Sequence, residues 1–252
     1  MDFTIKKYIS LIEILKYYNF QFDTLNNLIA EIETKTIFLR HDVDRIPYNS
    51  YILAKIEYEL GVNSTFYFRS IKGVFNEKII KKVSELGHEI GYHYEDLSLA
   101  KGDTKKAIQL FEQNLNKFRE IADIKTICMH GSPLSKCDNR AIWNVINYKD
   151  YGIILEPYFD IDYTKFFYIT DTGRRWNQSD VNIRDKVNTD YNIRIKNTNH
   201  LISLIENNQL PKNIIINTHP HRWFDPGPMW LRELVYQGMK NVIKKGLNKI
   251  KK

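Results

Sequence analysis

Carboxylate and imidazole side chains follow several apolar runs of the sequence, and the first of these runs is the most informative. The segment 36–44 is apolar until it ends in Arg-His-Asp-Val-Asp, which predicts a buried strand with ionisable groups at its carboxyl end. Because side chains alternate along a strand, Asp42 and Asp44 share one side, where a cation or a shared proton must relieve their repulsion. The alternative is an Asp-rich turn ahead of a helix that starts at Pro47.

Strand-like and helix-like segments alternate through most of the chain. Strands are expected at 37–42, 64–69, 89–94, 126–130, 153–159, 166–170 and 214–218, and helices at 47–60, 76–86, 104–121, 141–146 and 199–206, with a polar, irregular stretch at 179–197. Such alternation predicts a parallel sheet. Neither a linker nor a tandem repeat interrupts it, so the expected architecture is one α/β domain, either a distorted β/α barrel or a closely related open layout.

The first 34 residues differ from this pattern. A helix over 3–18, a strand-like piece at 20–22 and a helical stretch at 25–32 predict an N-terminal helical extension, residues 1–34, packed on the barrel. The barrel is expected to take residues 35–252 and to end in a C-terminal helix.

Reactive groups gather at the carboxyl ends of the strands in such folds. Those ends hold Asp42 and Asp44; His93, Glu95 and Asp96; His130; Asp171, Arg174, Arg175 and Trp176; and His219, His221 and Arg222. Carboxylates and imidazoles from separate strands form the ligand set of a hydrolytic divalent metal site, such as a zinc site with one position open to water. A second carboxylate could accept the proton of that water, and a histidine could protonate a leaving amine.

Three segments carry a resemblance to a known family. His41–Asp44, the string Gly-His-Glu-Ile-Gly-Tyr-His at 87–93, and Asn217–His219 resemble the polysaccharide deacetylase superfamily, also called the NodB-homology or carbohydrate esterase family 4 fold. The likeness spans about residues 35–223 and implies a distorted barrel of seven or eight strands that holds a divalent metal, with zinc expected. It also implies that Asp42 is the catalytic base, that Asp44 and His93 bind the metal, and that His219 is the general acid.

The chain departs from the family pattern at a metal ligand. The family's second metal histidine follows the first by four residues, and this chain has Leu97 there. Two ligands are too few for a tight site, so a third must come from elsewhere. His130 is the expected replacement, because it ends a strand and could point inward, and Glu95 and Asp96 are the alternatives.

Substrate contacts are expected from the arginines and a tryptophan near the last strands. The family's third motif contains an orienting arginine, which the segment 129–133 lacks, unless Arg174 or Arg175 replaces it. Arg174, Arg175, Trp176 and Arg222 suit an anionic substrate such as a uronic acid or a nucleotide-linked sugar. The alternative is that the arginines pair with nearby acids and that the tryptophan packs in the core.

These observations predict a metal-dependent carbohydrate deacetylase, a hydrolase of C–N bonds other than peptide bonds. Its substrate would be a small molecule or an oligosaccharide from bacterial surface polysaccharide biosynthesis, and the expected acyl group is acetyl. One alternative, motivated by Leu97, is a barrel that has lost the metal and binds a saccharide or a partner without turnover. Another is a metal-free amide hydrolase that uses Asp42 and His219 alone.

Charge and composition narrow the setting. The formal charge of +7 and the lysines of 244–252 are interpreted as compositional bias and a solvated helix end, not as a nucleic-acid or membrane site. The two cysteines show no paired framework, and neither a signal peptide nor an apolar run of about 20 residues is present. The expectation is a cytoplasmic protein that has no membrane span and binds no nucleic acid.

Overall fold

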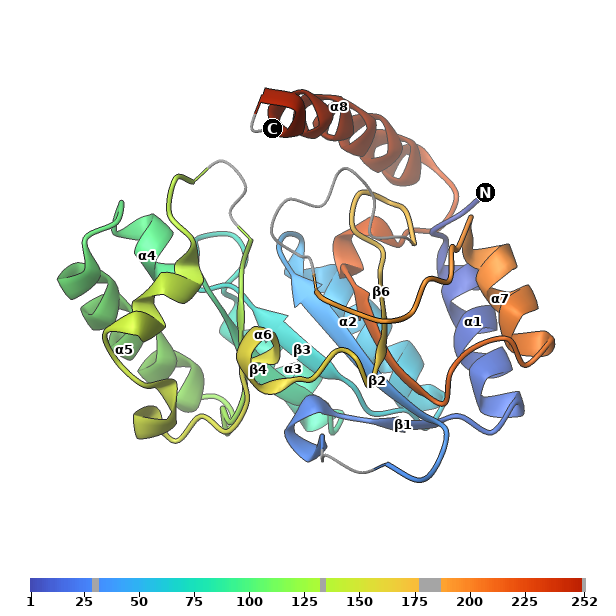
Figure 1. The fold of residues 1–252 in the computed structure, drawn as a ribbon, viewed down its shortest axis with the longest axis horizontal. Coiled ribbons are helices and arrows are strands. Elements are labelled where there is room, and N and C mark those ends of the chain that lie inside the picture. Colours follow the sequence, from blue (N-terminus) through green and yellow to red (C-terminus); the bar gives the residue numbers. More distant parts are fainter. Residues whose placement is uncertain (29–31, 132–134, 177–186, 251–252) are drawn as a thin grey trace.

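A parallel β-sheet forms the centre of the molecule. The computed structural model describes residues 1–28, 32–131, 135–176 and 187–250. Six strands follow one another in the order β5-β4-β3-β2-β7-β6, and β1 pairs with the first half of β2 (Figure 1). The strands are β1 (Gln21–Asp23), β2 (Thr36–Val43), β3 (Thr65–Phe68), β4 (Glu89–Tyr94), β5 (Ile127–Met129), β6 (Phe167–Thr170) and β7 (Asn213–Thr218). The predicted α/β fold with a parallel sheet is confirmed.

The sheet is curled, and no strand pairing joins β5 to β6 in the described part of the chain. An isolated bridge between Thr126 and Leu155 lies beside β5. All eight residues of β2 are buried, as expected for a central parallel strand covered on both faces. The registers place Arg40 beside Asn217 of β7 and His93 beside Cys128 of β5. The carboxyl ends of β2, β4, β5 and β7 therefore lie at one end of the sheet.

Helices cover the sheet along the crossovers. They are α1 (Ile5–Tyr17), α2 (Pro47–Glu59), α3 (Glu77–Glu85), α4 (Asp96–Leu99), α5 (Thr104–Arg119), α6 (Pro157–Asp160), α7 (Thr198–Glu206) and α8 (Pro228–Ile250), with short 3-10 turns η1 (Leu25–Asn27), η2 (Asn139–Asn144), η3 (Tyr148–Tyr151) and η4 (Pro220–Arg222). Figure 1 shows α1 and α7 on one side and α4 and α5 at the opposite edge. Side-chain caps start several helices: Thr4 in α1, Asn76 in α3, Asp103 in α5 and Asn197 in α7.

The N-terminal segment packs on the sheet as expected and also adds a strand to it. Leu11 and Leu15 of α1 share an apolar cluster with Ile37, Leu39 and Ile214 of the central strands. β1 extends the sheet in parallel with β2. The division of the chain at residue 34 stays a prediction. Part of the helical stretch expected at 25–32 lies outside the described residues, and what is described there is the 3-10 turn η1.

Two predicted elements are wrong. The apolar run 153–159 is not a strand, because Pro157 and the side chain of Glu156, which accepts a hydrogen bond from the Tyr158 backbone nitrogen, start the short helix α6 instead. The α-helix expected at 141–146 is the 3-10 turn η2, whose cap is Asp138. Of the polar stretch expected to be irregular at 179–197, the structure describes residues 187–197, and these are irregular as far as the start of α7.

The last helix, α8, lies at the periphery of the molecule, at the top of Figure 1. None of the helices in the described ranges combines the length and the apolar character needed to cross a bilayer.

Candidate active site

Three histidines from three strands surround the carboxylate of Asp44. The Nε2 atoms of His93 and His130 lie 3.6 and 3.5 Å from Oδ1 of Asp44, and Nε2 of His219 lies 3.8 Å from Oδ2. Asp44 follows β2, and the histidines come from β4, the end of β5 and the end of β7. The structure thus brings together residues that are 175 positions apart in the sequence, as the strand-end pattern predicted.

A strained turn fixes the position of Asp44. Ile46 adopts a left-handed conformation with φ of 52°, which a β-branched residue rarely does. The turn leads directly into Pro47 at the start of α2, whose N-cap is Ile46 and has no side-chain cap. The Asp44 side chain is therefore turned to the histidines, and the alternative that it caps the helix is wrong.

The tautomers of two of these histidines follow from their outer hydrogen bonds. Nδ1 of His93 lies 2.9 Å from the carbonyl oxygen of Cys128, which can only accept, so this nitrogen carries the proton. Nδ1 of His130 lies 2.9 Å from Oε2 of Glu95. In both rings it is then Nε2 that faces Asp44. This outer arrangement of carbonyl and carboxylate is the one that orients metal-binding histidines in proteins.

Arg69 holds the carboxylate behind His130. Its Nε donates to Oε1 of Glu95 at 2.6 Å, and its NH1 donates to the backbone oxygen of Asp44 at 3.2 Å. One guanidinium therefore connects the Glu95–His130 pair with the residue that both histidines face. Burial alone would raise the pKa of Glu95, but His130 and Arg69 lower it to about 2, so this side chain is an anion that supports His130.

The three inner atoms suit a divalent metal. Ligands at about 2.0–2.1 Å from a tetrahedral ion lie about 3.3–3.4 Å from one another, close to the two separations measured from Asp44 Oδ1. That oxygen is buried and has no hydrogen-bond partner among the described residues. Asp44, His93 and His130 form a group in which every ligand atom lies within 4.8 Å of the others. A second such group, Asp42, His93 and Cys128, shares one histidine with it.

The electrostatics of this cluster favour a positive charge. Burial alone would raise the pKa of Asp44, but the neighbouring His130, His93 and His219 hold it well below its usual value. Burial would lower the pKa of His93, whereas Asp42 and Asp44 raise it. The site thus contains ionised carboxylates beside the His93 imidazole, which attracts a proton or a cation. The residues fit a metal ion with nitrogen and oxygen ligands, and its identity as zinc stays a prediction.

Asp42 has a different environment, because an arginine of its own strand binds both of its oxygens. Nε and NH2 of Arg40 donate to Oδ1 and Oδ2 at 2.8 and 2.7 Å, and the side-chain amide of Asn217 donates to Oδ2 at 3.1 Å. Burial would raise the pKa of Asp42, but Arg40 and then His93 hold it far below its usual value. Oδ2 lies 3.9 Å from Nε2 of His93, so this anion borders the metal group.

The sequence analysis did not predict that Arg40 binds Asp42, although Arg40 is the first residue of the Arg-His-Asp-Val-Asp segment. Arg174, one of the expected replacements for the family's orienting arginine, donates instead to the backbone oxygen of Arg222. The signal was present, because positions 40 and 42 share one face of a strand as surely as 42 and 44 do.

His219 is held by a buried carboxylate on the neighbouring strand. Nδ1 lies 2.7 Å from Oδ1 of Asp171, which follows β6. Asp171 also accepts from the backbone nitrogen of His219 at 3.0 Å, from NH1 of Arg222 at 2.6 Å and from Nε1 of Trp223 at 2.9 Å. NH1 of Arg222 also lies 2.9 Å from Nδ1, but the ionised Asp171 carboxylate can only accept, so the Asp171 contact places the proton on Nδ1.

This arrangement has two consequences. Burial would raise the pKa of Asp171, but Arg222 and His219 lower it, so the carboxylate is an anion behind the ring. With the proton on Nδ1, Nε2 is the atom that faces Asp44 and can exchange a proton with a bound molecule.

The four predicted substrate-binding residues have mostly internal partners. Trp176 is buried, stacks on Phe3 and donates from Nε1 to Thr198 at 2.8 Å. Arg174 donates to the backbone oxygen of Arg222 at 3.1 Å, and Arg222 itself binds Asp171. Arg175 is exposed. Trp176 therefore packs in the core, as the alternative stated. Substrate binding by the four residues stays a prediction.

Neither alternative third ligand belongs to the group of Asp44, His93 and His130: Glu95 contacts the outer nitrogen of His130, and Asp96 turns away. The Asp96 carboxylate accepts from the Tyr92 hydroxyl at 2.8 Å and from the Asn114 amide at 2.7 Å, and burial raises its pKa to about 6. Leu97 packs in the apolar cluster beneath α4 and α5. His88, inside the Gly87–His93 string, lies 2.8 Å from the backbone oxygen of Ala54, away from the site. Part of the 129–133 motif lies outside the described residues.

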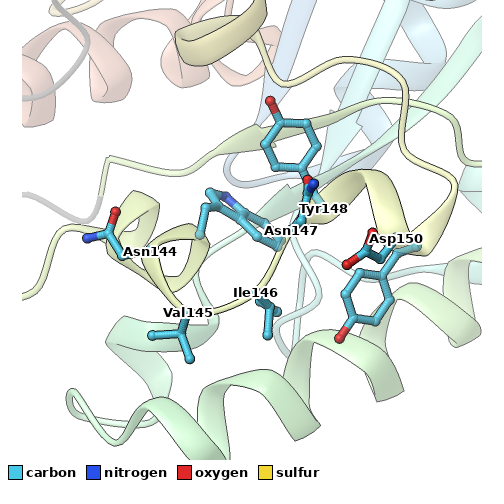
Figure 2. A pocket seen from close by; sticks show the side chains of 8 residues that line it. Asn144, Val145, Ile146, Asn147, Tyr148 and Asp150 are labelled. Carbon is cyan, nitrogen blue, oxygen red and sulfur yellow. The ribbon is translucent and has the colours of Figure 1, made fainter.

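A pocket of about 600 Å³ opens away from these groups, along η2 and η3. Figure 2 shows the side chains that line it, which are Trp143 to Tyr148, Asp150 and Tyr151. It contains one carboxylate and no imidazole, so nothing in it could bind a metal and transfer a proton as the strand ends could. We therefore place the candidate active site at the strand ends.

Fold and site together define an α/β protein with a metal-type cluster of carboxylates and histidines at the carboxyl ends of its strands. No protein-family model matches the chain, and no curated protein does. The similar solved structures include an esterase of carbohydrate esterase family 4 from Streptococcus mutans, at 13% identity and a TM-score of 0.47, over 86% of this chain and 83% of that one. The family 4 carbohydrate esterase PdaA of Bacillus subtilis matches at 13% identity and 0.45, over 92% and 83%.

A pseudoenzyme of the same family from Bacillus anthracis matches at 12% identity and a TM-score of 0.43, over 85% of this chain. The chain spans 63% of that protein, less than two thirds of its length. These solved structures belong to the family that the motifs of the sequence resemble.

Proposed function

We propose that the protein is a metal-dependent hydrolase that removes an acyl group, acetyl in the first instance, from an N-acylated sugar. One observation supports this most directly: the Asp44, His93 and His130 ligand atoms converge between an anchored carboxylate, Asp42, and an anchored imidazole, His219. The sugar, and a place in bacterial surface polysaccharide biosynthesis in the cytoplasm, are proposed from the motifs and composition of the sequence.

Each side chain has a defined part in this proposal. A divalent ion held by Asp44, His93 and His130 would polarise the acyl oxygen and bring the pKa of a bound water to about 7. Asp42 accepts the proton that the water loses as its oxygen adds to the acyl carbon. His219 gives a proton from Nε2 to the nitrogen as the C–N bond breaks, so that an acid and an amine leave.

The two anchors explain why these residues suit their parts. Arg40 and Asn217 take three of the lone-pair positions of Asp42 and leave Oδ1 with room for one more donor. Asp171 fixes the ring of His219 so that Nε2 is directed at the site, as a buried carboxylate does behind a catalytic histidine.

Acetate release from N-acetylated sugars, measured on the full chain with Zn²⁺, Co²⁺ or Mn²⁺ added, tests the proposal. We expect His219→Gln to lower kcat by about a hundredfold or more, which is the usual contribution of general acid catalysis, with metal uptake retained. His200→Gln is the matched control, because His200 lies in α7 and its Nδ1 accepts from the Lys196 backbone nitrogen. A metal-loaded protein that binds sugars and releases no acid would favour the non-catalytic barrel, and failure to take up any divalent ion would overturn the metal mechanism.

A further inference from the structure

The amphipathic helix α8 has its apolar face on the outside. Eight large apolar side chains of this helix are 38 to 72% exposed: Met229, Leu231, Leu234, Val235, Tyr236, Met239, Val242 and Ile243. Leu231, Val235, Met239 and Val242 recur at spacings of four, four and three residues, so they form one stripe along the helix. The polar residues Glu233, Gln237 and Asn241 are buried. At about 100° per residue these three lie on the face opposite to Val235.

Specific contacts hold the polar face against the body of the protein. Glu233 accepts from NH2 of Arg45 at 3.0 Å, and the Arg45 guanidinium lies 4.7 Å from the ring centre of Tyr236. Asn241 accepts from Gln237 at 2.8 Å and donates to the backbone oxygen of Gly173 at 2.9 Å. Rotating α8 to bury its apolar stripe would break all of these contacts. The outward apolar face is therefore built into the fold.

The positive charge of residues 240–252 indicates which kind of surface could cover the apolar face of α8. From Lys240 to Lys252 the sequence contains six lysines, and no acidic residue follows Glu233. We propose that the outer face of α8 docks on an anionic membrane surface, with the apolar stripe at the boundary between headgroups and acyl chains and the net positive charge of this part of the sequence attracted to the lipid phosphates. A parallel pairing with the α8 of a second copy is a poorer fit, because it would bring two sets of lysines together. The sequence alone indicated a solvated helix end, since it did not show which face of α8 the body covers.

The proposed docking also sets the orientation of the molecule. Arg45 directly follows Asp44, and Gly173 lies two residues after Asp171. Through these contacts α8 lies over the carboxyl ends of β2 and β6, which is the end that carries the candidate active site. A docked protein would therefore hold that end of the sheet toward the membrane. The inference goes beyond the proposed hydrolase activity, and its test needs no substrate.

Vesicle co-sedimentation of the full chain is the experiment. We expect binding to vesicles of phosphatidylcholine with about 30 mol% phosphatidylglycerol, little binding to pure phosphatidylcholine, and weaker binding as KCl rises from about 0.1 to about 0.5 M. At about 100° per residue, positions 232, 245 and 249 lie within about 80° of Val235, on the outer half of the helix. Replacing Arg232, Lys245 and Lys249 with Gln should lower affinity about fivefold per basic residue. The double variant Val235→Glu/Val242→Glu should lose binding at unchanged thermal stability, because both side chains are already exposed.

The control carries the same charge change on another surface. Val145→Glu/Ile154→Glu alters two exposed apolar residues outside α8 and should bind anionic vesicles nearly as wild type does. Equal loss in both double variants, or no binding of the wild type to anionic vesicles, would overturn the proposal. So would a dimer in analytical ultracentrifugation that Val235→Glu/Val242→Glu dissociates, because the stripe would then be an interface between copies.

Discussion

The carboxylate behind His130 offers a sharp test of the metal group. Glu95→Gln changes an anion that lies 2.9 Å from Nδ1 of His130 into a neutral amide of the same shape. The amide oxygen can still accept from the ring, so His130 keeps its orientation, but the negative charge that strengthens Nε2 as a ligand is lost. The side chain is only 6% exposed, so solvent screens this charge weakly.

The expected effect is a drop in metal affinity of ten- to a hundredfold, the usual result of changing such an outer partner. That corresponds to about 1.4 to 2.7 kcal/mol of binding free energy. Competition titration of Zn²⁺ or Co²⁺ between the full chain and a chelator of known affinity measures it directly. Thermal unfolding without metal, run in parallel, shows whether the variant is folded.

Asp96→Asn is the matched control. It makes the same carboxylate-to-amide change one residue further on, at another buried side chain, whose partners are Tyr92 and Asn114 instead of a histidine. Its metal affinity should stay within about twofold of wild type, because it touches none of the ligands. If Glu95→Gln binds metal as wild type does, or if Asp96→Asn weakens binding equally, then His130 is not a ligand oriented by Glu95.

Two further predictions concern stability. Arg40→Met leaves the Asp42 carboxylate buried without its cation and should lower the free energy of unfolding in urea by about 3 to 5 kcal/mol. Arg140→Met, which breaks a partly exposed pair with Asp138, should lower it by under about 1 kcal/mol. Similar losses in the two variants would contradict a buried ion pair at Asp42. Burial raises the Asp96 pKa from 3.8 to about 6, so the folded state holds this proton more tightly than the unfolded chain does. As the pH rises from 3.8 to 6, the free energy of unfolding of the wild type should therefore fall by up to about 3 kcal/mol relative to that of Asp96→Asn. Parallel stability curves for the two proteins would contradict that shift.

The parallel sheet, and the convergence of polar side chains at the carboxyl ends of its strands, could be predicted from the sequence, because both follow from the alternation of strand-like and helix-like segments. The strand at 37–42 and the helix that starts at Pro47 have local signals that tertiary packing did not override. His130 was expected for the right geometric reason, since it ends β5 and the structure places its Nε2 3.5 Å from Asp44. Whether it binds metal stays a prediction.

What the sequence could not supply was the direction of side chains outside regular strands. Asp96 and Glu95 are neighbours in the chain, yet one turns into the helix layer and the other toward His130, because α4 begins between them. The sequence left open whether Trp176 contacts substrate or packs in the core, and in the structure Thr198 and Phe3 lie beside its buried ring. The run 153–159 has strand-like composition, and Pro157 at a helix start decided its structure.

The placement of Arg40 two residues before Asp42 makes their ion pair independent of the loops of the protein. Anion and cation stand on one strand, so the pleat of β2 alone sets their relative position, and no loop has to close to bring them together. Insertions or deletions in the connecting segments would leave the pair intact. The charge-balanced carboxylate is therefore a property of the strand itself, whereas the ligand carboxylate of Asp44 depends on the turn that follows β2.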